Sequence, residues 1–304
     1  MKTALDHLPP RKRAELEEVV RILFAEFEDA LAGRNAPHRK AGKILKVILF
    51  GSYARGDWVE DPVGGYFSDY DILVVVNHEE LADPVEYWTQ AEDHLMRAQT
   101  ISKKIKTPVN PIYHSLTDVN AQLKKGRPFF VDIIRDGIAL YEAPDNPFKQ
   151  PIKLPPEEAR EEAQKSFDKW FPSAAEFLTL ADIAKREGMN NKAAFLYHQA
   201  TEHLYHCLIL VLTLYSKKSH KLNFLRSQCE GQDARLIAAW PRDTRFAQRC
   251  FELLRSAYIN ARYSDHYKIT VEELDWLRER ISHLQALVKE ICQERLADWL
   301  PHRI

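Results

Sequence analysis

The 304-residue sequence lacks several features that mark special classes of protein. Its four cysteines include no Cys-x-x-Cys pair, so neither a zinc knuckle nor a disulfide framework is indicated, and we expect buried, reduced thiols. The net charge of −1 gives no broad nucleic-acid-binding surface. The longest apolar run, Cys207 to Tyr215, is less than half of the roughly 20 residues that a bilayer crossing needs. Because the first residues also lack the apolar segment of a signal peptide, we expect a soluble, cytoplasmic protein without a membrane partner.

Glycine is scarce, but it is concentrated in one region. Five of the ten glycines fall in a single stretch: Gly42, Gly51, Gly56, Gly64 and Gly65. Two β-branched runs, Lys46 to Phe50 and Asp71 to Val76, border this stretch and predict strands buried on both faces. The clustering indicates a backbone that must turn sharply or approach another group closely.

The first half of the chain has the pattern of an α/β unit. Apolar residues at spacings of three and four predict a helix from Ala14 to Leu31. Further strands are predicted at Thr107 to His114, at Phe129 to Ile134 and at Gly137 to Glu142. We therefore predict a first domain over residues 1–143.

Five prolines between Ala143 and Pro156 predict a stiff linker over residues 144–156. The remainder, residues 157–304, has apolar stripes with helical spacing and a capping box formed by Thr270 and Glu273. The expected fold class is α+β, with a sheet domain flanked by helices and followed by an all-α helical bundle.

The glycine-rich stretch has the chemistry of a nucleotide site. A strand that ends at Phe50 and continues into Gly51-Ser52 can hold phosphate oxygens with backbone amides and a hydroxyl, and Arg55 adds charge-assisted hydrogen bonds. Asp69 and Asp71 are two residues apart on a strand, so both carboxylates leave one face, about 6 to 7 Å apart. Such a pair calls for a cation, and Mg²⁺ or Mn²⁺ shared with substrate phosphates fits this ligand set.

The segments "GSYARGD" and "SDYDILVVV" resemble the signature of the DNA polymerase β nucleotidyltransferase superfamily, in its minimal nucleotidyltransferase branch. The resemblance implies a mixed sheet with flanking helices. It also implies that Gly51 and Ser52 bind a nucleoside triphosphate and that Asp69 and Asp71 are catalytic and bind Mg²⁺, with Arg55 at the usual basic position. The implied reaction transfers a nucleoside monophosphate, AMP from ATP in our reading, to a hydroxyl and releases pyrophosphate.

The family usually has a third carboxylate on a later strand, where it acts as a base. The matching position in this sequence is Asn110, a neutral group that cannot take a proton. Asp132 is a candidate substitute, although an aspartate there can equally brace a turn. Catalytic turnover is therefore a weaker expectation than nucleotide binding.

The segments Lys192 to Tyr215 and Leu253 to Leu277 resemble the helical domain known as HEPN, which is often paired with minimal nucleotidyltransferases. The resemblance implies a homodimer and, in ribonuclease members, an active Arg and His separated by four to six residues, with RNA as the partner. Here only three residues separate Arg262 from His266. In related pairs the transferase attaches AMP to a tyrosine beside this motif, a place that Tyr263 and Tyr267 occupy.

Three polar residues on the predicted helix, His198, Glu202 and His206, follow one another at four-residue spacing and therefore share one face. They could form a metal site or a polar seam between helices. The sequence leaves both interpretations open.

Four functions are compatible with these patterns. The first is a Mg²⁺-dependent nucleotidyltransferase, with a tyrosine of its own helical domain as one candidate acceptor in a toxin-antitoxin-like self-modification. The alternatives are a HEPN ribonuclease regulated by the first domain, a nucleotide-binding regulator without turnover, and an aminoglycoside-type transferase with a small-molecule acceptor.

Overall fold

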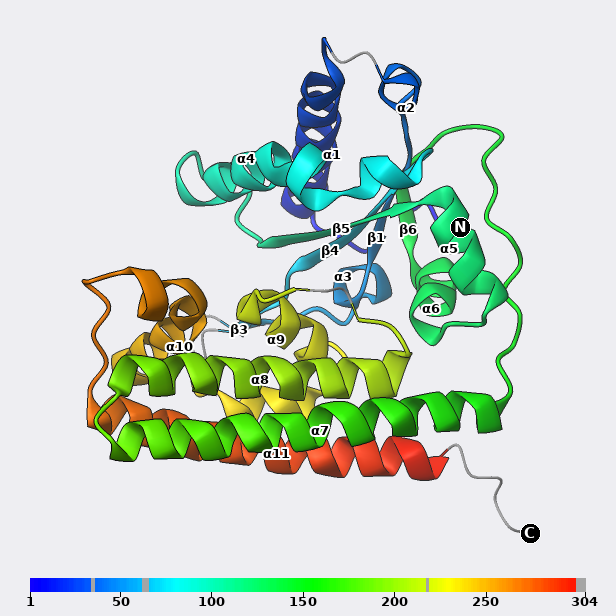
Figure 1. Cartoon of the computed structure of the whole chain (residues 1–304). Coiled ribbons are helices and arrows are strands. Elements are labelled where there is room, and N and C mark those ends of the chain that lie inside the picture. The colour runs from blue at the N-terminus through cyan, green and yellow to red at the C-terminus, as the bar shows by residue number, and fades with distance from the viewer. Residues whose placement is uncertain (34–35, 62–65, 217–218, 299–304) are drawn as a thin grey trace. The chain divides into compact units, whose positions relative to one another are not determined.

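The computed structural model describes the whole chain except residues 34–35, 62–65, 217–218 and 299–304. Contacts within the chain divide it into two compact units. The first comprises Met1–Glu60 and Phe67–Lys153, and the second contains Asp61–Tyr66 and the chain from Leu154 onward. The N-terminal unit is built on a sheet and the second is helical, so the expected α+β fold class is confirmed (Figure 1).

A four-stranded mixed sheet organises the N-terminal unit. Its order is β5-β4-β1-β6, formed by Val109–Ser115, Tyr70–Val76, Ile44–Phe50 and Ile138–Glu142. Strand β1 is antiparallel to both β4 and β6, whereas β4 and β5 run parallel. Every residue of β1 is buried, which confirms the prediction of strands covered on both faces.

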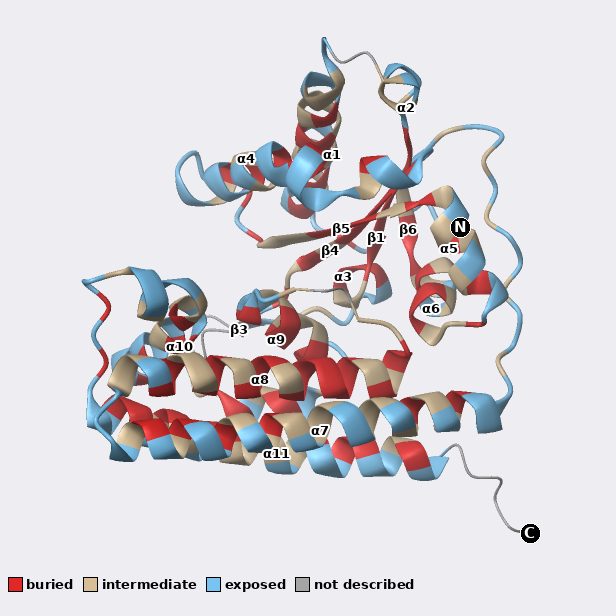
Figure 2. Ribbon diagram, in the orientation of Figure 1, coloured by how far each residue is buried: buried red, intermediate tan, exposed pale blue. Residues whose placement is uncertain are grey.

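Helices cover both faces of this sheet. Helix α1 (Pro10–Leu31) and helix α4 (Thr89–Thr100) share one core with alternate residues of β1 and β4. Helix α5 (Leu116–Lys124) and helix α6 (Pro128–Asp136) pack together, and α5 also contacts β4 and β5 (Figure 1). Strands β1 and β4 are coloured almost entirely as buried in Figure 2.

Smaller elements of the unit are α2 (Pro37–Lys40), α3 (Ser52–Arg55), η1 (Glu79–Ala82) and η2 (Pro84–Trp88). A further two-stranded sheet pairs β2 (Glu60–Asp61) with β3 (Tyr66–Phe67), and its residues are divided between the two units.

One predicted strand is wrong. The segment Phe129 to Ile134 lies within helix α6. Pro128 occupies the first turn, where its fixed φ favours a helix start, and Phe129, Phe130 and Ile133 are its buried residues. Asp132, the candidate substitute carboxylate, is therefore on a helix; it is about half exposed and pairs with Arg135 at 2.9 Å.

The proline-rich segment after β6 is attached to the N-terminal unit. The Lys149 amide donates to Asn120 Oδ1 at 2.7 Å, and the Ile152 amide donates to the Leu123 carbonyl at 3.1 Å. Both acceptors belong to α5. The segment thus follows that helix before the second unit begins.

The second unit consists of α7 (Pro156–Arg186), α8 (Asn190–Thr213), α9 (Leu222–Glu230), η3 (Ala234–Ala239), α10 (Arg245–Tyr263) and α11 (Val271–Asp298). Helix α8 is central, because it packs against α7, α9, α10 and α11. The predicted capping box is present at the start of α11: the Glu273 amide donates to Thr270 Oγ1 at 3.2 Å, and the Thr270 amide donates to Glu273 Oε2 at 2.8 Å.

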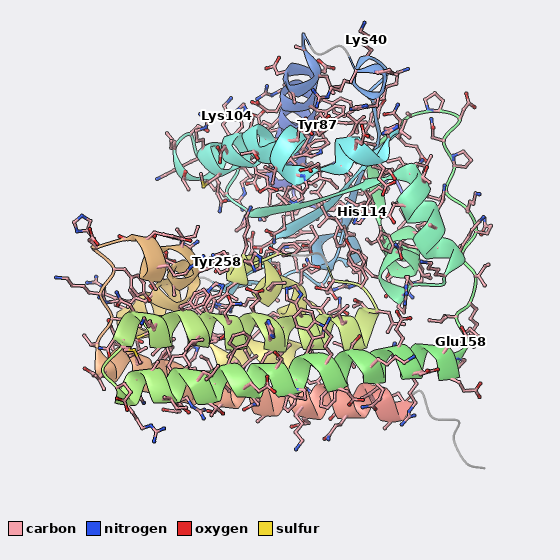
Figure 3. The ribbon with its side chains drawn as sticks, viewed as in Figure 1. Lys40, Tyr87, Lys104, His114, Glu158 and Tyr258 are labelled. Atoms are coloured by element: carbon pink, nitrogen blue, oxygen red, sulfur yellow. The ribbon has the colours of Figure 1, made fainter. Side chains whose placement is uncertain are left out.

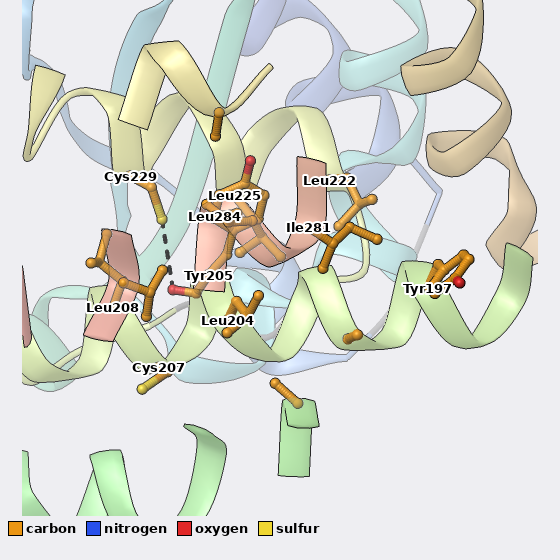
Figure 4. Close-up of a cluster of buried hydrophobic side chains, with 14 of the residues drawn as sticks. Tyr197, Leu204, Tyr205, Cys207, Leu208, Leu222, Leu225, Cys229, Ile281 and Leu284 are labelled. Carbon is orange, nitrogen blue, oxygen red and sulfur yellow. Dashed lines mark hydrogen bonds between the residues drawn. The ribbon is translucent and has the colours of Figure 1, made fainter. Parts of the chain in front are cut away.

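The helical core confirms the expected state of the cysteines. All four are buried and free, and Figure 4 shows Cys207 and Cys229 among leucine side chains. The Cys229 thiol donates to the Tyr205 carbonyl at 3.6 Å, and burial raises its pKa well above the usual value. These thiols are therefore structural groups rather than reactive ones.

Within the described parts of the chain, no helix combines the length and the apolar character that a membrane crossing requires.

Candidate active site

The turn after β1 has a geometry that only glycine tolerates. Gly51 has φ of 73° and ψ of −152°, a region essentially closed to other residues. A Cβ added to it would lie 2.4 Å from Asp71 Oδ2. The glycine therefore lets the backbone leave the sheet and also makes room for a carboxylate on the neighbouring strand.

Strand pairing gathers the polar residues at one end of the sheet. Asp71 lies opposite Phe50 of β1 and opposite Asn110 of β5. Asp69 comes directly before β4, and its Oδ2 accepts a hydrogen bond from Asn110 Nδ2 at 2.8 Å. The structure thus brings Gly51, Asp69, Asp71 and Asn110 together at this end of the sheet.

Ser52 and Arg55 begin and end the single turn of α3. Ser52 is half-buried, and Arg55 is exposed, with its Nε 3.1 Å from Asp57 Oδ2. The Arg55 guanidinium also helps to lower the pKa of Asp136, after the larger effect of Arg135. Both residues therefore lie on the short helix that directly follows Gly51.

The two aspartates fit a magnesium ion shared with a substrate. Among the described residues, no group of three or more His, Cys, Asp and Glu side chains has an arrangement that could hold a metal by itself. Mg²⁺ commonly takes one or two carboxylates and completes its shell with waters and substrate phosphates. Asp69 and Asp71 are half-buried, and the Asn110 amide already satisfies one oxygen of Asp69.

A buried polar network connects helix α1 to the segments that carry the Gly51 turn, the two aspartates and Asn110. Lys12 of α1 is 3% exposed; its Nζ donates to Tyr53 Oη at 2.9 Å and to Thr107 Oγ1 at 2.6 Å, and it also pairs with Glu60. Tyr53 follows Gly51-Ser52, and Thr107 precedes the strand that carries Asn110. Lys12 therefore connects two of the segments that form the site.

Glu15, one turn further along α1, connects the third segment. Its Oε2 accepts hydrogen bonds from Tyr70 Oη at 3.1 Å and from Thr107 Oγ1 at 2.9 Å. Tyr70 lies between Asp69 and Asp71 in sequence, and its ring is 4.6 Å from that of Tyr53. Burial raises the pKa of Tyr70, so this hydroxyl remains a neutral donor.

Lys12→Met should destabilise the protein by about 1 to 3 kcal/mol, because it removes the donor to the buried Tyr53 and Thr107 hydroxyls and the cation that pairs with Glu60. Chemical denaturation of full-length protein measures this change. Arg21→Gln is the matched control: it removes an exposed pair with Glu18 on the same helix and should cost less than about 1 kcal/mol. Equal effects of the two variants would contradict a structural role for the network.

In the helical unit, Arg262 and His266 are not in contact among the described residues. The Arg262 Nε donates to the Tyr258 carbonyl at 2.6 Å, and its guanidinium lies over the rings of Phe195, Tyr258 and Tyr263. His266 is exposed on the loop after α10, where its amide donates to Ser264 Oγ at 3.3 Å. A paired Arg-His site within one chain is therefore not formed by these two residues.

The two candidate acceptor tyrosines have different environments. Tyr263, at the end of α10, is 76% exposed, with the Arg262 guanidinium 5.0 Å from its ring. Tyr267 is 7% exposed, and its hydroxyl donates to the Leu253 carbonyl at 2.9 Å. Burial also raises the pKa of Tyr267. Tyr263 is the tyrosine that a second molecule or domain can reach.

The polar residues of α8 do not form one cluster. His206 bonds to Ser216 Oγ at 2.7 Å and to the Ser219 carbonyl at 3.1 Å, whereas His198 bonds to the Leu254 carbonyl at 2.9 Å. Glu202 accepts from His220 and lies 3.6 Å from His198. The arrangement matches the polar seam rather than the metal site.

Sequence patterns missed the buried network and the pairing of His220 with Glu202. The positions of two tyrosines could have indicated the network. Tyr53 directly follows Gly51-Ser52, and Tyr70 lies between Asp69 and Asp71. Lys12 gave no signal, because it lies in an ordinary basic stretch at the start of a helix.

Comparison with known proteins identifies both halves of the chain. Residues 36–138 match the family model described as a nucleotidyltransferase domain, and residues 167–294 match the model of the HEPN domain. A protein of Methanocaldococcus jannaschii with the name "Putative protein adenylyltransferase" is 48% identical over 50 residues, which are 16% of this chain and 39% of that protein. Since the match spans well under half of that relative, the likeness is local.

The first of these matches includes Gly51, Asp69, Asp71 and Asn110, and the second includes Arg262 and the α8 histidines. The chain therefore joins a nucleotidyltransferase domain to a HEPN domain in one polypeptide.

Proposed function

We propose that the N-terminal domain transfers AMP from ATP to a hydroxyl group of a protein and releases pyrophosphate. The observation that carries the proposal is the convergence of the Gly51 turn with Asp69 and Asp71. The local likeness to a protein named as an adenylyltransferase supports AMP as the transferred group.

Each residue has a definite task in this reaction. The amides after Gly51 and the Ser52 hydroxyl bind phosphate oxygens, and Arg55 adds a cation beside them. Asp69 and Asp71 would hold Mg²⁺, or Mn²⁺, which supplies neutralisation of phosphate charge. Asn110 fixes the orientation of Asp69 through its amide, because an amide can donate a hydrogen bond but cannot serve as a base.

Tyr263 is the proposed acceptor in the HEPN domain. Its exposure makes it accessible, and the nearby Arg262 guanidinium can pair with an incoming phosphate. The hydroxyl of Tyr267 already donates to Leu253 in the interior, so it is the poorer acceptor.

Incubation with ATP and Mg²⁺ should add AMP to wild-type protein and to Tyr267→Phe, but not to Tyr263→Phe. Intact-mass and peptide mass spectrometry measure the adduct. Tyr267→Phe also removes a buried hydrogen bond and should cost about 1 kcal/mol of stability. An adduct that persists in Tyr263→Phe would overturn this acceptor but not the transferase.

A nucleotide-binding regulator without turnover is the second candidate. It is favoured by the hydrogen bond from Asn110 to Asp69, which puts a neutral donor where a third carboxylate would act as a base. Such a protein would bind ATP without releasing pyrophosphate.

Asn110→Asp distinguishes the transferase from the regulator without turnover. It replaces a hydrogen bond of 2.8 Å by two like charges, so the variant should be less stable than wild type by about 1 to 3 kcal/mol without Mg²⁺ and should regain stability with it. If wild type is a regulator limited by the missing base, pyrophosphate release should appear only in the variant. Comparable release by wild type would favour the transferase.

A further inference from the structure

Two buried polar residues of helix α1 have no task in the proposed reaction. Lys12 and Glu15 are each 3% exposed. Lysine and glutamate are almost never fully buried unless they have specific partners. A spacing of three residues puts both on one face of the helix, the face that meets the segments of the nucleotide site. Their contacts therefore indicate what the pair does.

Glu15 binds two hydroxyl groups with a single carboxylate oxygen. Its Oε2 accepts hydrogen bonds from Tyr70 Oη at 3.1 Å and from Thr107 Oγ1 at 2.9 Å. Tyr70 is fully buried and stands between Asp69 and Asp71 in the sequence. The Glu15 carboxylate thus fixes the side chain that separates the two candidate metal ligands.

Tyr70 reaches Glu15 from the far side of the strand. Successive side chains of a strand point to opposite faces, so the Tyr70 ring enters the core with α1 while Asp71 lies on the other face, beside Gly51. The Tyr70 amide also donates to the Pro108 carbonyl at 2.8 Å. Because both its backbone and its side chain are held, the segment that carries the aspartates has little freedom to shift.

Lys12 holds the turn after β1 in the same way. Its Nζ donates to Tyr53 Oη at 2.9 Å and lies 5.0 and 5.7 Å from the ring centroids of Tyr53 and Tyr70. Tyr53 directly follows Ser52 in α3. One turn of α1 therefore contacts both the short helix after Gly51 and the strand β4, which fixes these two segments relative to each other.

An exposed contact joins α1 to the same region and provides a comparison. Lys104, which is labelled in Figure 3, precedes β5, and its Nζ lies 3.5 Å from Glu18 Oε1 of α1. The Lys104 side chain is 64% exposed. Exposed ion pairs contribute little to stability, so this contact should have no influence on the site.

We propose that Glu15 is a positioning residue for the divalent cation: through the Tyr70 hydroxyl it holds Asp69 and Asp71 where they can bind the ion together with nucleotide phosphates. Mg²⁺ demands near-ideal octahedral geometry, so a small shift of either carboxylate weakens its binding. The inference rests on the proposed function, in which these aspartates hold Mg²⁺ or Mn²⁺. It adds to that function a determinant of cation affinity on the opposite face of the sheet.

The test measures cation binding rather than transfer of AMP. Calorimetry gives the affinity of the full-length protein for a non-hydrolysable ATP analogue, once with saturating Mg²⁺ and once with EDTA. The ratio of the two affinities reports how well the protein holds the cation. Tyr70→Phe removes only a hydroxyl; it should lower this ratio about threefold to tenfold, less than the loss typical of groups bonded directly to a metal ligand. The affinity in EDTA should stay unchanged.

Two variants match this change without touching the nucleotide site. Tyr197 is a buried tyrosine of the helical unit, and its hydroxyl donates to Asp182 Oδ1 at 2.8 Å. Tyr197→Phe removes the same chemical group and should lower the midpoint of denaturation as Tyr70→Phe does, but it should leave the affinity ratio unchanged. Lys104→Gln removes the exposed contact with α1 and should also leave the ratio unchanged.

Glu15 itself is tested by a conservative and a disruptive change. Glu15→Gln keeps an oxygen that can accept from Tyr70, so the affinity ratio should stay close to that of wild type. Glu15→Leu should lower the ratio at least as far as Tyr70→Phe does. If Glu15→Leu does not fold, Tyr70→Phe keeps the test valid.

The same affinity ratio in wild type and Tyr70→Phe would overturn the positioning role, and so would an equal fall in Tyr197→Phe. Neither result depends on AMP transfer, because the analogue is not cleaved. Absence of pyrophosphate release from ATP by wild type would count against the proposed function alone, whereas Mg²⁺ without effect on wild-type affinity would overturn both.

Discussion

Asp69→Ala should reduce pyrophosphate release by about a hundredfold to a thousandfold, because in the proposed reaction Asp69 would hold the metal ion that neutralises the phosphate charge. Asp71→Asn should have a similar effect. The measurement is pyrophosphate release with Mg²⁺ and each of the four ribonucleotides. Comparing the nucleotides in wild type also identifies the base that the site prefers.

The chain offers a matched control for this result. Asp132 is an exposed aspartate of the same domain that pairs with Arg135 on α6, so Asp132→Ala should leave release unchanged. Asp69→Ala also removes the acceptor of the hydrogen bond from the Asn110 side-chain amide. This loss should lower the free energy of unfolding by about 1 to 2 kcal/mol, which chemical denaturation would measure. Unchanged release by Asp69→Ala would remove the proposed mechanism.

Gly51→Ala should be the second severe variant, for two separate physical reasons. Alanine cannot adopt the Gly51 backbone angles without strain, and its Cβ would meet Asp71 Oδ2 at 2.4 Å. Together these effects should cost about 2 to 4 kcal/mol and displace the carboxylate. Denaturation measures the stability, and pyrophosphate release measures the consequence for the site.

Gly33→Ala separates the effect of backbone strain from the effect of a steric clash. Gly33 also has a positive φ, of 71°, but an added Cβ there would meet nothing within 4 Å. This variant should lose only about 1 kcal/mol, from backbone strain alone. If both variants lose the same stability, and Gly51→Ala keeps its activity, the close approach of Gly51 to Asp71 has no functional meaning.

Local patterns predicted the parts of the site that are close in sequence. The strand ending at Phe50, the Gly51-Ser52 turn and the two aspartates are all encoded within about 25 residues, and their residue types can be interpreted directly. Asn110 was identified because it starts a recognisable strand. The parallel pairing of β4 with β5 then places it opposite Asp71, and its side chain bonds to Asp69.

Contacts between distant segments could not be predicted in this way. Lys12 bonds to Thr107, which is 95 positions away in the sequence. His220, in the segment between α8 and α9, bonds to Glu202 of α8, which is 18 positions away. The error at α6 has a different cause: a short run of Phe, Val and Ile has high strand propensity, whereas the preceding Pro128 favours the start of a helix.

The position of Lys12 and Glu15 bears on where the first domain begins. Both residues lie before residue 36, where the match to the nucleotidyltransferase family starts, yet they bond to side chains in each of the three segments that form the site. Helix α1 also supplies a large apolar surface to the core on one side of the sheet. The smallest part of this sequence able to fold as an autonomous enzyme unit therefore extends upstream of the recognisable family segment, to include α1.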